Sequence, residues 1–210
     1  MTGLPFQKII EFTECITEFV MLNIMWFAGC LLGGIVFGWA PSTVALLTVF
    51  RDKIMKKDYQ GAISSFWTTY KKEFKKSNIL GAICVLFLLI VSINKANFDA
   101  QPELIFLILS TVSTVARIFI FGIVLYMFPL YVHYDMELKK YFFTAINLLV
   151  AKPFVTICIA IWTLLAYLMV ASMPAIIAVL GISLYFYGIM AINYQFFMRN
   201  EMRLRAENSK

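Results

Sequence analysis

The sequence predicts an all-α integral membrane protein, a helical bundle with five transmembrane helices. Three observations predict this class: 61% of the 210 residues are hydrophobic, only 14% are charged, and the apolar residues gather in long stretches. Average soluble domains are about 45–50% apolar and about 25% charged. A soluble core of this size cannot bury so much apolar surface, because the buried fraction rises only slowly with chain length. The composition therefore argues against a water-soluble enzyme or a nucleic-acid-binding protein.

Five stretches are long enough to cross a bilayer core, which requires about 20 mostly apolar residues. They cover about residues 17–38, 78–96, 103–130, 153–172 and 174–196. Prolines open the last two stretches at positions that helices tolerate, and the short connection between these stretches predicts a tight antiparallel hairpin. We expect residues 1–210 to form a single membrane domain.

The connecting segment 40–77 is more than a loop. Its second half alternates the aromatic residues Phe66, Trp67, Tyr70 and Phe74 with four lysines. The aromatic spacing of three and four is typical of one helix face. The pattern predicts amphipathic cytoplasmic helices that lie along the membrane surface or pack beneath the bundle.

The distribution of basic residues predicts the orientation. With the N-terminus outside, 15 of the 18 basic residues fall on one side, in segment 40–77, the third connection and the tail 197–210. Only Lys8 and Lys95 fall outside, and Arg117 lies within the third stretch. Under the positive-inside rule this asymmetry predicts an external N-terminus and a cytoplasmic C-terminus. The net charge of +6 then needs no nucleic-acid partner.

Motifs for catalysis or metal binding are missing from the sequence. It contains no P-loop, no G-x-S-x-G and no H-E-x-x-H motif. Its single histidine and four isolated cysteines do not form a zinc-binding pattern. We therefore expect a protein that is not an enzyme, with no catalytic residue, no cofactor and no metal site.

Glycines recur at a spacing of four in the first stretch, as Gly29-x-x-x-Gly33 and Gly34-x-x-x-Gly38. Such pairs allow two helix backbones to approach closely in lipid. Two alternatives are open: packing against helices of the same chain, or a contact face for another subunit.

Arg117 is the charged residue nearest the middle of a predicted span. A charge at that depth costs on the order of 3 kcal/mol and usually faces a partner or a cavity. One interpretation is an arginine that is satisfied within the bundle or that snorkels toward the inner face. Within the bundle its partners would be the hydroxyls of Ser110, Ser113 and Thr114 on its own face, amides such as Asn23, or carbonyls. The other is an arginine that faces an intersubunit groove, an anionic lipid or a substrate group.

Six aromatic residues cluster near the predicted inner interface: Trp39, Trp67, Tyr126, Tyr131, Tyr134 and Tyr141. An interfacial aromatic belt explains them. The alternative is a platform on which a sugar stacks on the inner side.

One group of motifs lies in the first half of the chain: Asn23-x-x-Trp26, the run Gly38-Trp-Ala-Pro41-Ser-Thr-Val-Ala45, Arg51 and Phe66-Trp67-x-x-Tyr70-Lys71-Lys72. A second group lies further along the chain: the run Tyr126-Met-Phe-Pro129-Leu130, Leu138-Lys139 and Ala145. In these motifs the sequence resembles the YesL-like family of small bacterial membrane proteins of unknown function. The family's usual basic residue after the second proline corresponds to His133.

The resemblance implies an accessory role in sugar uptake, since members tend to be encoded beside carbohydrate ABC importers and glycan-degrading enzymes. We expect a non-catalytic subunit of the bacterial cell membrane that binds the permease subunits and stabilises or regulates the importer. The alternative is a small transporter or channel, acting alone or as a homo-oligomer. The candidate contact residues are Arg117, Asn23, Trp26, Gly29, Gly33, Gly38, Pro41, Phe66, Trp67 and Pro129.

Overall fold

The computed structural model describes residues 4–55 and 61–208, and these residues are helical throughout apart from short connections. The helices are α1 (Leu4–Leu32), α2 (Trp39–Ile54), α3 (Ala62–Asp99), α4 (Leu104–His133), α5 (Leu138–Ala151), α6 (Pro153–Ser172), the π-helix η1 (Ile177–Gly181) and α7 (Ile182–Asn208). Five helical segments in the described residues are long and apolar enough to cross a membrane, in α1, α3, α4, α6 and η1–α7. The predicted all-α membrane fold with five such helices is confirmed.

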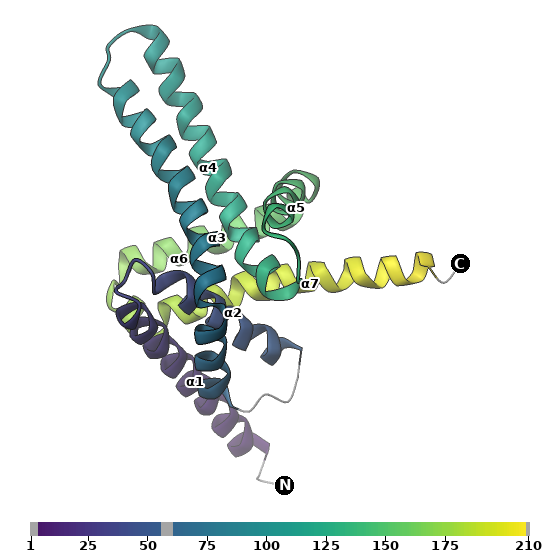
Figure 1. Ribbon diagram of the computed structural model, residues 1–210. Coiled ribbons are helices and arrows are strands. Elements are labelled where there is room, and N and C mark those ends of the chain that lie inside the picture. Colours follow the sequence, from purple (N-terminus) through teal and green to yellow (C-terminus); the bar gives the residue numbers. More distant parts are fainter. Residues whose placement is uncertain (1–3, 56–60, 209–210) are drawn as a thin grey trace.

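Helices α3 and α4 form a long antiparallel hairpin that projects away from the other helices (Figure 1). The half of this hairpin near its tip is largely exposed and apolar, as at Leu86, Ile90, Leu107 and Phe119. The half near its base is packed into the core, where Leu80 and Tyr126 are almost fully buried. The outer half therefore offers an apolar surface that lipid or another protein chain must cover.

Helix α2 lies at the centre of the molecule and contacts α1, α3, α4 and α7. Every residue from Ala40 to Leu47 is buried, as are Val49 and Phe50. The expectation of a helix on the membrane surface is wrong for this part of segment 40–77. The physical reason is that residues 40–50 are uncharged on all sides, and a helix without a polar face is buried.

Residues 62–77 also differ from the expectation, because they are not a separate amphipathic helix. They form the first part of α3, which continues without a break into the apolar part of the same helix. No proline occurs between Ala62 and Asp99, so the sequence contains no strong signal to end the helix at the membrane surface.

Helices α1 and α2 form a hairpin with a tight turn at residues 33–38. Gly34 and Ile35 both have φ of 66°, the left-handed conformation that reverses the chain. At the open end of the hairpin, Lys53 on α2 forms an ion pair with Glu18 on α1. The tip is apolar and exposed, with Leu32 at 73% and Phe37 at 62% of their full accessibility. Residues 33–38, expected to end the first span, therefore form the turn.

The predicted tight hairpin of the last two spans is confirmed. Trp162 Nε1 on α6 donates a hydrogen bond to the carbonyl of Tyr185 on α7, at 3.0 Å. Helix α5, a short helix between α4 and α6, was not expected from the sequence. Only Tyr141 and Ala145 of α5 are buried, so a narrow strip of this helix contacts the core.

A candidate polar pocket between α2, α3 and α4

A pocket of about 530 Å³ lies between α2, the first part of α3, the end of α4 and the α4–α5 connection. Ligand pockets are typically about 300–1,000 Å³, so this volume suits a small molecule. Its polar lining residues are Thr48, Arg51, Thr69, Lys72, Glu73, Lys76, Tyr131, His133, Tyr134, Asp135 and Tyr141. The pocket therefore combines basic, acidic and hydroxyl groups at one end of an otherwise apolar protein.

Arg51 joins two walls of the pocket. Its Nε and Nη2 donate to the carboxylate of Asp52 at 3.0 and 2.8 Å, and its Nη1 donates to the backbone carbonyl of Val132. Because Val132 is near the end of α4, this side chain fastens α2 to α4. A charge-assisted bond of this kind is stronger than a neutral one.

Two tyrosines complete the walls. Tyr131 donates to the carboxylate of Glu73 at 2.6 Å, which joins α4 to α3. The hydroxyl of Tyr141 donates to the carbonyl of Tyr134 at 2.7 Å and accepts from the N–H of Met136 at 2.9 Å. Burial raises the pKa of Tyr141, and the nearby Asp135 and Glu73 carboxylates act in the same direction, while the Met136 bond opposes them. Tyr141 is therefore a neutral phenol that fixes the α4–α5 connection.

Asn23 and Trp26, two predicted contact residues on α1, bind other parts of the chain. Asn23 is fully buried, and its amide donates to the carbonyls of Ile177 and Ala178 at 3.0 and 2.8 Å. Its Oδ1 accepts from the N–H of Ser183 at 3.2 Å. One side chain of α1 therefore binds two carbonyls of the π-helix η1 and an N–H in the first turn of α7.

The remaining α1 contacts are made with α2 and α3. Trp26 Nε1 donates to Thr43 Oγ1 at 3.1 Å. Tyr70 on α3 donates to the carbonyl of Gly29 at 2.8 Å. A Cβ on Gly29 would collide with Ser42 on α2.

Gly33 and Gly38 face one another across the turn. A Cβ on Gly33 would collide with the backbone of Gly38, and one on Gly38 would collide with the backbone of Cys30. Pro41 is buried in the first turn of α2. The glycine spacing therefore serves a close approach within the chain in this structure.

Phe66, Trp67 and Pro129 lie in or beside the core rather than in the pocket. Phe66 is fully buried, and its ring contacts Trp67 edge-to-face at 5.3 Å between centroids. Pro129 is buried in the last turns of α4. The structure thus does not bring the ten predicted contact residues together at one site.

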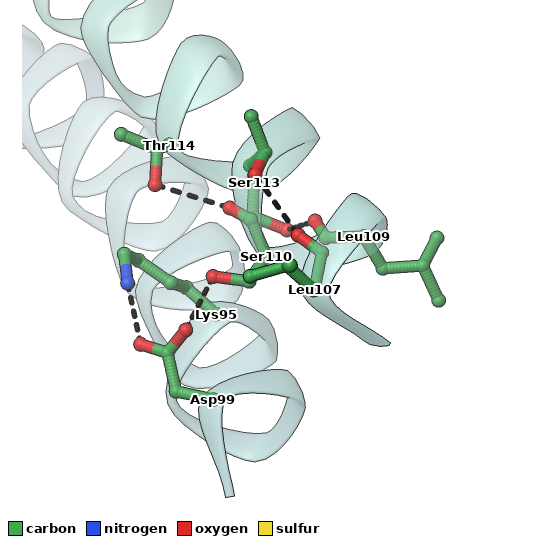
Figure 2. Close-up of polar contacts among 8 residues, drawn as sticks. Lys95, Asp99, Leu107, Leu109, Ser110, Ser113 and Thr114 are labelled. Carbon is green, nitrogen blue, oxygen red and sulfur yellow. Dashed lines mark hydrogen bonds and ion pairs between the residues drawn. The ribbon is translucent and has the colours of Figure 1, made fainter. Parts of the chain in front are cut away.

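Arg117 is exposed in the projecting half of α4 and forms no hydrogen bond or ion pair with another described residue. The three hydroxyl residues expected on its face are bound elsewhere. Ser113 and Thr114 donate to carbonyls of their own helix at 2.8 and 3.0 Å, and Ser110 donates to the carboxylate of Asp99 (Figure 2). Asp99 also forms an ion pair with Lys95, and the charge of Arg117 acts on it from a greater distance.

Comparison with known proteins connects this architecture to a family. A family model described as "Protein of unknown function, DUF624" matches residues 19–95. The uncharacterized protein YesV of Bacillus subtilis (strain 168) is 32% identical over 188 residues, which is 90% of this chain and 90% of YesV. The chain belongs to this family. Its uncharacterized relatives YteU and YesL, from the same strain, are 31% and 33% identical over 92% and 71% of this chain and 87% and 70% of their own lengths.

The resemblance to the YesL-like family is therefore confirmed. No solved structure matches the chain. The pocket brings together the two groups of residues that carry the resemblance, because Arg51 and Lys72 come from the first and His133 and Leu138 from the second. Arg51 and Val132 are 81 positions apart in sequence, so only the fold reveals that these residues meet.

Proposed function

We propose that this YesL-like protein is a non-catalytic accessory subunit of a carbohydrate ABC importer in the bacterial cell membrane. In this proposal it binds the permease subunits and stabilises or regulates their assembly. The carbohydrate importer is the partner class that the family resemblance implies. The proposal is carried by one observation, the exposed Arg117 on the apolar α3–α4 hairpin.

The position of Arg117 within the membrane is energetically unfavourable without a polar partner. A guanidinium that faces lipid near the middle of a span costs on the order of 3 kcal/mol, so such residues face polar partners. The hydroxyls beside Arg117 are bound to other groups, and Asp99 already pairs with Lys95. A permease helix that carries a carboxylate or carbonyl group would satisfy Arg117 and cover the exposed apolar surface around it.

The alternative, a transporter or channel acting alone, receives less support. Beyond the polar pocket, Leu80, Cys84 and Met127 of α3 and α4 are buried and apolar, and Cys84 Sγ lies 3.8 Å from Met127 Sδ. These apolar side chains lie between the pocket and the polar contact of Ser110 with Asp99 near the hairpin tip.

Replacing Arg117 with leucine is expected to lower the recovery of permease subunits about tenfold, the loss for a contact worth about 1.4 kcal/mol. The measurement is co-purification from native membranes in mild detergent, with the subunits identified by mass spectrometry. Arg117→Lys keeps the charge and should retain most of the complex. Lys95→Leu, which removes a basic residue from the same hairpin, is the matched control and should retain it fully.

Unchanged recovery with Arg117→Leu, at equal membrane levels of the variant, would contradict the proposal. A homo-oligomer that contains no permease and moves solute in liposomes would replace it with the transporter alternative.

The proposed orientation retains a cytoplasmic C-terminus under the positive-inside rule. The distribution of basic residues predicted an external N-terminus, but the α1–α2 hairpin favours the opposite side. Its open end, at Glu18 and Lys53, lies at the same end of the molecule as Arg51 and Val132, whereas its tip is apolar. We propose that this hairpin enters the membrane and returns, so that both termini are cytoplasmic.

An N-terminal tag and a C-terminal tag are therefore expected to show the same protease protection in spheroplasts and the same cleavage in inverted vesicles. A tag inserted at residues 100–103, at the tip of the α3–α4 hairpin, should show the opposite pattern and serves as the control. Protection of the two terminal tags on opposite sides would mean five full crossings and would contradict the re-entrant hairpin.

A further inference from the structure

One wall of the polar pocket carries basic groups with little to bind in the described part of the chain. Lys72 and Lys76 are four residues apart on α3 and thus lie on one face, with Thr69 one turn earlier. Lys72 Nζ is 4.0 Å from the carboxylate of Glu73, which is a loose pair, and its side chain is 78% exposed. Lys76 and Thr69 make no hydrogen bond or ion pair with another described residue. These three groups are available to a ligand.

The other polar groups of the pocket are mostly engaged and hold its shape. Arg51 is bound to Asp52 and Val132, and Tyr131 is bound to Glu73. Tyr141 holds the α4–α5 connection. The pocket is therefore a built cavity with a pre-formed frame and a basic wall that is free to bind.

The charges around the pocket indicate a ligand that is anionic and also polar. Three basic residues, Arg51, Lys72 and Lys76, line it with His133, against the carboxylates of Glu73 and Asp135. Lysine ammonium groups bind phosphate well. The two carboxylates would repel a bare polyanion, but they accept hydrogen bonds from hydroxyl groups. A ligand with its phosphate at the lysine wall and its hydroxyl groups directed to Glu73 and Asp135 would bind both the basic groups and the carboxylates.

The position of the pocket along α3 determines whether such a ligand can reach it from the lipid bilayer or from the aqueous side. Lys76 is followed within three residues by the apolar run Ile79–Ile93, so the pocket lies where α3 changes from basic to apolar. Basic pockets between helices at this level bind anionic lipid headgroups. The same level is also open to soluble molecules from the aqueous side.

We propose that this pocket binds a hydroxylated phosphate ester through Lys72, Lys76 and Thr69. The two sources of this chemistry are the glycerol phosphate headgroup of phosphatidylglycerol and a free sugar phosphate. This inference goes beyond the proposed function and does not depend on it, because binding is measured on the purified protein without a permease.

The test uses the full-length protein in nanodiscs. In one arm the discs contain phosphatidylcholine, and glucose 6-phosphate and glycerol 3-phosphate are titrated by calorimetry. In the other arm the protein is purified from discs that also contain phosphatidylglycerol, and retained lipid is counted by native mass spectrometry. The pair Lys72→Gln and Lys76→Gln is expected to weaken binding at least about tenfold in the arm that binds.

The matched control is the pair Lys71→Gln and Lys75→Gln. It removes the same charge from exposed positions of the same helix that do not line the pocket, and it should leave binding within about twofold. Binding in the first arm alone identifies a soluble phosphate ester, and binding in the second alone identifies the lipid headgroup. No binding in either arm, or equal losses in the two double variants, would overturn the proposal.

Discussion

Replacing Asn23 with leucine is expected to lower the stability of the protein by about 2–3 kcal/mol. Leucine has the same branched side-chain shape but can neither donate to the carbonyls of Ile177 and Ala178 nor accept from the N–H of Ser183. Three backbone groups around η1 would lose their side-chain partner at once. The measurement is the midpoint of thermal unfolding in detergent, which falls about 2–4 °C for each kcal/mol in a chain of this size.

Asn193→Leu is the matched control for this prediction. Asn193 is also fully buried, but its amide donates only to the carbonyl of Ile189 on its own helix, at 2.9 Å. That carbonyl lies within a continuous α-helix, so leucine should cost less there. Equal midpoints for the two variants would mean that Asn23 does not stabilise η1. Asn23→Asp should be at least as harmful as leucine, since a carboxylate facing two carbonyl oxygens is repelled.

Replacing Gly38 with alanine is expected to cost about 1–3 kcal/mol, in the range of overpacked sites. A Cβ at Gly38 would collide with backbone atoms of Cys30. These atoms cannot move aside as the end of a flexible side chain can. The turn between α1 and α2 would have to open, and this would disturb the central helix α2. The unfolding midpoint and the yield of monodisperse protein should both fall.

Gly122→Ala is the control for this change. The three atoms nearest to a Cβ there all belong to the side chain of Leu149, which can rotate away. The unfolding midpoint of the Gly122→Ala variant should stay close to that of the unaltered protein. A Gly38→Ala variant as stable as Gly122→Ala would show that the turn tolerates a wider separation of α1 and α2.

The membrane-crossing helices could be predicted from the sequence because hydrophobic length is a local property. The stretch 153–172 coincides with α6, since Pro153 at its start and Pro174 just beyond its end restrict the helix. The predicted end of the first stretch, residue 38, lies six residues beyond the end of α1 at Leu32. Residues 33–38 are as apolar as a span, and hydropathy alone does not reveal that the chain turns there.

The buried position of α2 and the pocket could not be predicted in the same way. Arg51, Asp52 and Lys53 at the end of α2 made the whole segment look amphipathic, although residues 40–50 carry no charge. The pocket depends on the register between α3 and α4, which sets Tyr131 opposite Glu73. Residue spacing within one helix contains no information about that register, so the pocket could not be predicted from the sequence.

Helix α3 is a single helix of 38 residues that contains both the lysine wall and, at the hairpin tip, Asp99. From Lys72 to Asp99 it spans about 40 Å, at 1.5 Å per residue. No proline interrupts α3 over this length, so the helix tilts as one rigid rod. A rotation of α3 about its buried part, from Ser77 to Cys84, must move the two ends in opposite directions. A displacement of the base of α3 can therefore move its tip on the far side of the membrane without a hinge or a change in secondary structure.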